Sequence, residues 1–238
     1  MLTTLIALLA LAAPPAESYN QGNACYGRND YAGAAAAYEQ ALQAGPNADA
    51  FYNLGNARFK AGSIGLAIAS YRRAQWLRPR DRDIAANLAF ARSYRVDKTL
   101  ALPGPFAVFL DQAFHLLSPR EASLSAALCF LLVALLMALY IVTRRAPWLY
   151  AAIPFALIFI IAAITAMVWH GERAARPAVV TVPEVSALSG PGPDYKEILL
   201  AHDGGECAVR DARGEWLLVQ FPGGAGGWVR KDAVTMVF

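Results

Sequence analysis

Residues 51–79 read FYNLGNARFKAGSIGLAIASYRRAQWLRP, and their spacing of small, aromatic and proline positions also occurs 33 residues earlier in the chain. The matching pairs are Gly22 and Gly55, Ala34 and Ala67, Tyr38 and Tyr71, Ala41 and Ala74, and Pro46 and Pro79. A fixed period of about this length is typical of stacked helical hairpins. Stacked hairpins form extended binding surfaces, so the repeat predicts a protein that binds another protein.

The small residues of the second copy indicate where its two helices meet. Gly55 and Ala67 favour a close crossing of the helices, with Tyr71 filling the space beside it. Gly62 follows the first helix, at a turn where glycine adopts left-handed geometry at low cost. Pro79 ends the second helix, because proline cannot continue a helix interior. The pattern resembles a tetratricopeptide (TPR) repeat, which it matches at Phe51, Leu54, Gly55, Phe59, Ala67, Tyr71, Ala74 and Pro79.

The helical-repeat segment is predicted to cover residues 15–98. The first copy, residues 19–46, departs from the pattern at Gln21, where an aliphatic residue is expected. Residues 87–92 (NLAFAR) repeat residues 53–58 (NLGNAR) at a spacing of 34. We interpret them as a capping helix, because an uncapped stack leaves an apolar face exposed.

The resemblance to TPR arrays implies that the first helix of each hairpin lines a concave groove. The groove-facing positions are then Asn23, Tyr26, Tyr52, Asn56, Phe59 and Lys60. Asparagine amides can hydrogen-bond an extended peptide backbone, and aromatic rings supply contact area at low entropic cost. The alternative is that the tyrosine and phenylalanine rings pack between the repeats.

A group of arginines lies near the end of the second hairpin, at Arg72, Arg73, Arg78, Arg80 and Arg82. A solvated helix end is the favoured interpretation, because cations are stabilised at a helix C-terminus. An acidic partner or lipid headgroups are the alternatives.

Two uncharged stretches, residues 122–142 and 148–169, are each long enough to cross a bilayer as a helix. The connecting residues 143–147 are so few that both flanks must lie on one side of the membrane. Arg144 and Arg145 favour a cytoplasmic connection, which places both flanking domains outside. Neither stretch carries a titratable group at depth, so a simple two-helix anchor is predicted rather than a transporter.

The segments beside the membrane hairpin have their own signals. Residues 1–13 are rich in leucine and alanine and resemble a secretory signal sequence, although no lysine or arginine precedes the apolar run. An uncleaved anchor or a different start is the alternative. Residues 99–121 form a linker in which residues 105–117 place apolar side chains at helical spacing. This amphipathic helix is expected either on the outer leaflet or against the capping helix.

Residues 176–238 have a different composition, in which short β-rich runs alternate with glycine and proline turns. This pattern predicts a small antiparallel barrel. The segments 185–195, 214–219 and 227–230 resemble a bacterial SH3-like domain, with Leu188 at a position usually held by arginine. Such domains bind peptides or cell-wall stem peptides in some families. The resemblance implies groove residues Tyr195, Trp216 and Trp228, and the alternative places these rings in the barrel core.

No catalytic or metal-binding pattern is found. The histidines His115, His170 and His202 lie in separate segments, and the common nucleophile, metal and nucleotide-binding motifs are absent. We therefore expect no enzyme, no metal and no cofactor. Cys25 and Cys207 either pair or remain free thiols. The net charge of +3 comes without clustered basic residues of the kind that bind nucleic acid, so no nucleic-acid partner is expected.

The order of segments predicts a multidomain membrane protein: an export signal, all-α TPR repeats, a two-helix transmembrane hairpin and an all-β SH3-like barrel. This order resembles the BatE-like TPR proteins of Bacteroides aerotolerance operons. The resemblance implies an adaptor at the bacterial inner membrane with both domains periplasmic. It also implies stress tolerance as the setting, with von Willebrand A proteins and a MoxR-type ATPase as neighbours. The alternative is a cell-wall sensor or tether that binds peptidoglycan through the SH3-like domain.

Overall fold

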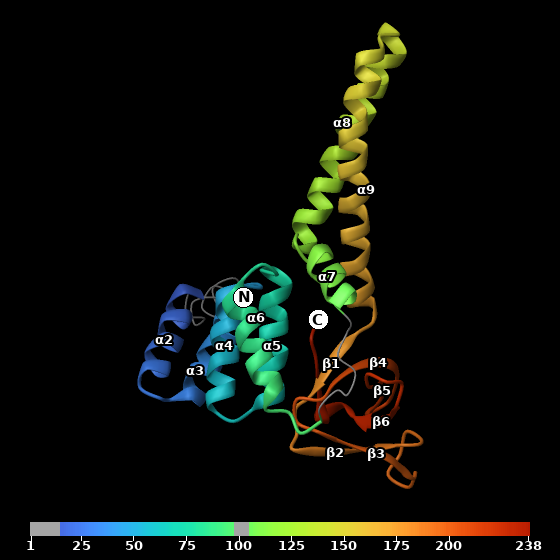
Figure 1. Cartoon of the computed structure of the whole chain (residues 1–238). Helices are drawn as coiled ribbons and strands as arrows, with labels where there is room; N and C mark the ends of the chain where they lie inside the picture. The colour runs from blue at the N-terminus through green and yellow to red at the C-terminus, as the bar shows by residue number, and fades with distance from the viewer. Residues whose placement is uncertain (1–14, 98–104) are drawn as a thin grey trace, which may run out of the picture. The chain divides into compact units, whose positions relative to one another are not determined.

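The computed structural model describes residues 15–97 and 105–238 (Figure 1). The predicted signal sequence, residues 1–13, lies outside the described residues, as does the start of the linker. The described residues form two compact units. One contains residues 15–77, 81–97 and 176–238, and the other contains residues 78–80 and 105–175.

The repeat segment folds as consecutive helical hairpins followed by one further helix, as predicted. The helices are α2 (Pro15–Gly27), α3 (Tyr31–Leu42), α4 (Ala48–Lys60), α5 (Ile64–Leu77) and α6 (Arg82–Ser93). Several of these helices have a side-chain cap at the N-terminus. Asp30 accepts a hydrogen bond from the backbone amide of Gly33, Asn47 accepts one from the amide of Ala50, and Asp81 accepts one from the amide of Ile84. Such caps satisfy amides that have no partner in the first helical turn.

The repeated glycines are required by close contact between the helices of each hairpin. A Cβ atom on Gly22 would lie 2.5 Å from Cε1 of Tyr38, and one on Gly55 would lie 2.5 Å from Cε1 of Tyr71. Both distances are far inside van der Waals contact, so only glycine fits. Gly62 has a φ of 83°, which confirms the left-handed turn predicted there.

The second unit contains a long helical hairpin. Its helices are α7 (Pro105–Phe114), α8 (Pro119–Thr143) and α9 (Ala146–Ala174), and α8 and α9 run side by side in Figure 1. Within the described residues, two helices, α8 and α9, are long and apolar enough to cross a membrane. Both extend beyond the uncharged stretches that predicted them. Helix α8 begins with a capping box, in which Ser118 and Glu121 each bond the other's backbone amide.

The C-terminal residues form an antiparallel sheet, as predicted. Its strands are β1 (Pro177–Val180), β2 (Glu184–Leu188), β3 (Glu197–His202), β4 (Glu206–Arg213), β5 (Trp216–Gln220), β6 (Gly226–Arg230) and β7 (Val234–Met236). The order in space is β3-β2-β6-β5-β4-β1-β7, and in the described residues no pairing joins β3 to β7. The sheet is therefore not closed, and the SH3-like barrel stays a prediction. Strand β2 was not predicted as a strand; residues 185–195 entered only as part of the SH3-like resemblance.

One face of this sheet is covered by its own apolar core. Among the core residues, Val180, Val219 and Val229 are completely buried. Cys207 also belongs to this core, whereas Cys25 lies in a separate cluster among α2, α3 and α4. Both cysteines are free thiols in the structure.

The sheet packs against the end of the repeat stack. Val179 of β1 and Val237 share one buried apolar cluster with Ile68 of α5 and Leu88 of α6. Nearby, the ring of Phe238 lies 4.2 Å from that of Trp76, measured between centroids. The sheet thus covers apolar surface of α5 and α6 that an uncapped stack would leave exposed.

Charged groups also join the sheet to the helices. Asp203, in the turn between β3 and β4, accepts hydrogen bonds from the amides of Ile64 and Gly65 at 3.0 and 2.9 Å. It therefore caps α5 from a distant part of the sequence. Asp97 in turn accepts from the backbone amide of His202 at 2.8 Å.

The most enclosed of these charged groups is Glu206 of β4. Its carboxylate contacts Arg92 at 2.7 Å, Arg72 at 2.9 Å and Arg95 at 3.1 Å. Arg73 donates to the backbone carbonyls of Val237 and Met236. The interpretation of Arg72 and Arg73 as a solvated helix end was therefore wrong, because both are bonded to the C-terminal sheet.

Candidate functional site

A network of asparagine and tyrosine side chains repeats along the helices of the stack. The hydroxyl of Tyr38 in α3 donates to Oδ1 of Asn23 in α2 at 2.8 Å. One period later, the hydroxyl of Tyr71 in α5 donates to Oδ1 of Asn56 in α4, also at 2.8 Å. The tyrosine whose ring packs on the repeated glycine thus also orients an asparagine of the preceding helix.

A second set of hydrogen bonds links each hairpin to the next. Nδ2 of Asn53 donates to the hydroxyl of Tyr19 at 2.8 Å, and Nδ2 of Asn87 donates to the hydroxyl of Tyr52 at 2.9 Å. Asn87 also donates to Oδ1 of Asn56 at 2.9 Å. The predicted groove residues Tyr52 and Asn56 therefore connect α4 to the capping helix α6.

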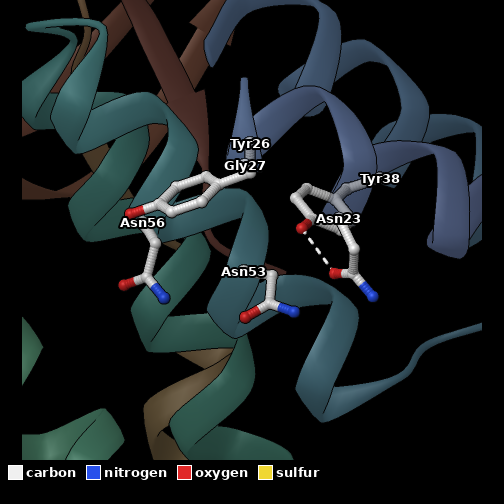
Figure 2. Close-up of a pocket in the computed structure, with 6 residues that line it drawn as sticks. All are labelled: Asn23, Tyr26, Gly27, Tyr38, Asn53 and Asn56. Atoms are coloured by element: carbon white, nitrogen blue, oxygen red, sulfur yellow. Dashed lines mark hydrogen bonds between the residues drawn. The ribbon is translucent and has the colours of Figure 1, made fainter. Parts of the chain in front are cut away.

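The network surrounds a small pocket of about 190 Å³ between the first hairpin and α4 (Figure 2). The residues that line it are Asn23, Tyr26, Gly27, Tyr38, Asn53 and Asn56. The predicted groove residues Asn23, Tyr26 and Asn56 are thus brought together from α2 and α4. Figure 2 shows Asn23, Asn53 and Asn56 among the side chains that line the pocket.

The hydrogen bonds decide what each asparagine can offer to a ligand. An amide oxygen has two acceptor positions, and both on Asn56 are filled by Tyr71 and Asn87. Its amide nitrogen is therefore the group that can bind a ligand. Asn23 also uses its oxygen internally, whereas Asn53 uses its nitrogen and keeps an oxygen for a ligand. Donors and an acceptor in one pocket complement the C=O and N–H groups of a peptide.

Tyr38 and Tyr71 remain neutral hydroxyls near neutral pH. Burial, together with the nearby Tyr19 and Tyr26, raises the pKa of Tyr38 to about 12. Burial likewise raises the pKa of Tyr71. A neutral hydroxyl can donate a hydrogen bond to the asparagine oxygen, so the orientation of Asn23 and Asn56 is maintained over the whole physiological pH range.

An aromatic cluster lies at the other end of α4. The ring of Phe59 packs 5.4 Å from Phe90 and 5.2 Å from Tyr94, measured between centroids. Phe90 and Tyr94 keep 53% and 57% of their surface exposed. Lys60 is exposed at the end of the same helix. The predicted site residues thus fall into a polar pocket and an aromatic patch, and their role in binding stays a prediction.

The sequence reasoning missed Tyr38, Asn53 and Asn87 as parts of the network, and Phe90 and Tyr94 as parts of the aromatic patch. A signal for the asparagines was present, because Asn87 follows Asn53 by 34 residues. Tyr38 was used only as a packing residue of the repeat. No comparable signal distinguished the aromatic residues of α6 from ordinary core positions.

The predicted SH3-like groove residues lie on and beside the sheet. Trp216 and Trp228 are diagonal neighbours on β5 and β6, because Trp216 pairs with Arg230 and Trp228 with Leu218. They lie on the face opposite the buried valines of the core. Trp228 is buried, and the guanidinium of Arg213 lies 5.2 Å from its ring centroid. The Trp216–Trp228 face is therefore separate from the apolar core, and its role as a groove stays a prediction.

Tyr195 lies in the connection between β2 and β3 and is 52% exposed. A Cβ atom added to Gly190 would lie 2.4 Å from its ring, so the loop is packed closely against this tyrosine. The exposed ring can contact a ligand without a change in the loop.

Comparison with known proteins supports the helical part of this description. A tetratricopeptide repeat family model matches residues 19–87, which include α3, α4 and α5 and parts of α2 and α6. No curated protein matches the chain. The repeats, with their polar pocket, define the chain as carrying a TPR protein-interaction module, which indicates an adaptor between proteins.

Proposed function

We propose that the protein is a membrane-anchored adaptor that binds an extended peptide segment of a partner protein in its TPR groove. The observation that carries this proposal is the pocket, where two asparagine nitrogens and one asparagine oxygen are oriented by internal hydrogen bonds. A peptide backbone offers the complementary groups at regular spacing. Oriented groups lose little entropy on binding, which favours affinity from a small surface.

The aromatic patch provides a second contact for the peptide, which fixes the orientation of the peptide relative to the polar pocket. Phe59, Phe90 and Tyr94 form a partly exposed apolar surface beyond the polar pocket, formed by α4 and α6. An apolar side chain of the peptide packs here while its backbone is held at Asn23 and Asn56. Rigid aromatic residues commonly supply most of the binding energy in such interfaces.

The hairpin of α8 and α9 holds this module at a membrane. Leu128 and Leu131 of α8 and Ile161 of α9 are about 60% exposed, which suits lipid contact better than water contact. The repeats and the sheet form one unit although the hairpin separates them in sequence. The chain must then enter and leave the membrane on the same side, which requires an even number of crossings.

The proposed side of the membrane and the proposed partners rest on the sequence. Arg144 and Arg145 between the two helices favour a cytoplasmic turn, which leaves the repeats and the sheet in the periplasm of a bacterial inner membrane. The resemblance to BatE-like proteins points to membrane-anchored von Willebrand A proteins and a MoxR-type ATPase as partners, in stress tolerance. Confinement of both partners to one membrane raises their effective concentration, so a weak groove is sufficient.

The test is photo-crosslinking of the full-length protein in membranes of its own cells, with a photoreactive amino acid in place of Phe90. We expect a segment of a membrane protein to be captured and identified by mass spectrometry. The change Asn23→Ala combined with Asn53→Ala should reduce capture at least tenfold. The matched control is Asn20→Ala, an exposed asparagine of the same helix that does not line the pocket. Equal capture by all variants would refute the pocket as the binding site.

A second candidate function is attachment to peptidoglycan through the SH3-like sheet, and the exposed ring of Tyr195 favours it. Purified full-length protein in detergent should then sediment with isolated cell walls, and Tyr195→Ala should reduce the sedimented fraction. Retention that does not depend on Tyr195 would contradict this alternative.

A further inference from the structure

Helix α7, which precedes the membrane hairpin, carries exposed aromatic side chains. Phe106 is 72% exposed and Phe109 is 63% exposed. Leu116, just after the helix, is 60% exposed. Apolar groups gathered on a short helix and left open to water usually mark a surface that contacts another phase or molecule.

The C-terminal end of α7 is fixed to the end of α9. Nε2 of His115 lies 2.7 Å from Oε1 of Glu172, and the His115 ring meets that of Trp169 edge-on at 4.4 Å between centroids. Nε1 of Trp169 donates to the carbonyl of Leu117 at 2.9 Å. Trp169 itself is buried in this junction, with 4% exposure. The helix is therefore anchored at one level of the hairpin.

This junction marks the water-facing end of the hairpin. It contains the carboxylate of Glu172 and the imidazole of His115, and the carboxylate of Glu121 lies in the first turn of α8. Such groups are costly within hydrocarbon. Tryptophan is enriched at the boundary between lipid and water, because its ring is apolar and its N–H is polar. Helix α7 leaves directly from this boundary and is about 15 Å long, at 1.5 Å per residue.

We propose that α7 lies in the headgroup layer of the bilayer, with Phe106 and Phe109 inserted among the upper acyl chains. This inference rests on the proposed membrane anchoring. Lipid is the occupant because Leu124 and Leu128, in the first turns of the adjoining helix α8, are also exposed, each at 60%. A helix of this kind adds interfacial binding to that of the spanning helices and restricts their tilt.

The test uses full-length protein reconstituted in phosphatidylcholine vesicles, with an environment-sensitive fluorophore on Phe109→Cys or, separately, Phe106→Cys. The native cysteines are buried, and changing them to alanine leaves one labelling site. Quenching is measured with lipids that carry a nitroxide either high or deep on the acyl chain and with aqueous iodide. Leu131→Cys in α8 reports on hydrocarbon, and Glu215→Cys, an exposed position of the sheet, reports on water.

We expect the label at residue 109 to be quenched at least threefold more strongly by the shallow nitroxide than by iodide. The label at residue 106 should show the same preference for the shallow nitroxide. Quenching mainly by iodide would overturn the inference, since α7 would then lie in water. Protection from both quenchers would also overturn it, because α7 would then be covered by protein. If the label at residue 131 also escapes the lipid nitroxides, the membrane anchoring itself fails. Lipid quenching at residue 131 alone refutes only the placement of α7.

Discussion

Replacing Glu206 by glutamine should destabilise the unit formed by the repeats and the sheet. The Glu206 side chain is only 14% exposed and bonds Arg72, Arg92 and Arg95. Burial by itself raises the pKa of this carboxyl, but the hydrogen bonds and charges of the arginines lower it from 4.5 to about 2. A shift of this size corresponds to about 3 kcal/mol of folding free energy. Removing one partner of a buried ion pair typically costs a similar amount.

The measurement is urea unfolding of the full-length protein in detergent, followed by pulse labelling of thiols and mass spectrometry. Cys207 reports on the sheet and Cys25 on the repeats, since both are buried in the folded state. We expect Glu206→Gln to lower the unfolding free energy by about 3 kcal/mol at pH 7, with both cysteines labelled at lower urea. Glu215→Gln is the matched control, because Glu215 is exposed on the same sheet. A loss below about 0.5 kcal/mol, the range of ordinary surface changes, would refute the reasoning.

The pH dependence gives an independent check. A carboxyl whose folded pKa is lowered stabilises the fold fully above its unfolded pKa of 4.5, and this contribution is lost as pH falls toward about 2. The difference between wild type and Glu206→Gln should therefore shrink from pH 5 to pH 2. Burial raises the pKa of Asp203, which acts in the opposite direction. That effect cancels because both proteins retain Asp203.

Three further changes test other parts of the structure by thermal or urea unfolding of the full-length protein. Gly55→Ala should cost about 1–3 kcal/mol by forcing a methyl group into the Tyr71 ring. Gly27→Ala, where a Cβ atom meets nothing within 4 Å, should cost nothing, and equal losses would refute the close-contact explanation. Tyr71→Phe should cost about 1 kcal/mol by removing the hydrogen bond to Asn56, and an unchanged stability would contradict that bond. Asp203→Ala should cost about 1–2 kcal/mol by uncapping α5, and faster amide exchange at Ile64 and Gly65 is the specific sign of that loss.

The repeats could be predicted because their constraint is local and occurs twice. Gly22 and Gly55 meet tyrosines of the following helix, and a fixed period makes that contact visible in one sequence. The apolar length of α8 and α9 is equally direct. Most strands were also predictable from β-rich runs between glycine and proline turns. Strand β2 was missed because residues 184–188 were not among the predicted β-rich runs.

The joint between the repeats and the sheet was not predictable, because its partners are far apart in the sequence. From its neighbours in the sequence, Asp203 is expected to be a turn residue. Only the folded structure shows that it lies at the N-terminus of α5. Arg72 and Glu206 are separated by 134 positions, and the residues around each of them do not indicate that the two side chains form an ion pair. In the pocket, the asparagine type predicted a hydrogen-bonding role. Which atom of Asn53 or Asn56 is available depends on tyrosines from other helices.

The apolar cluster shared by the repeats and the sheet can form only after the whole chain has been synthesised. Leu88 and Val237 belong to this cluster and are 149 positions apart, with the α8–α9 hairpin between them. At about 5–20 residues per second, a ribosome needs roughly 7–30 seconds to connect them. The apolar end of the repeats is therefore uncovered during the time in which residues 105–175 are synthesised. A chaperone that shields this end of the stack, and releases it when the sheet arrives, would raise the yield of folded protein.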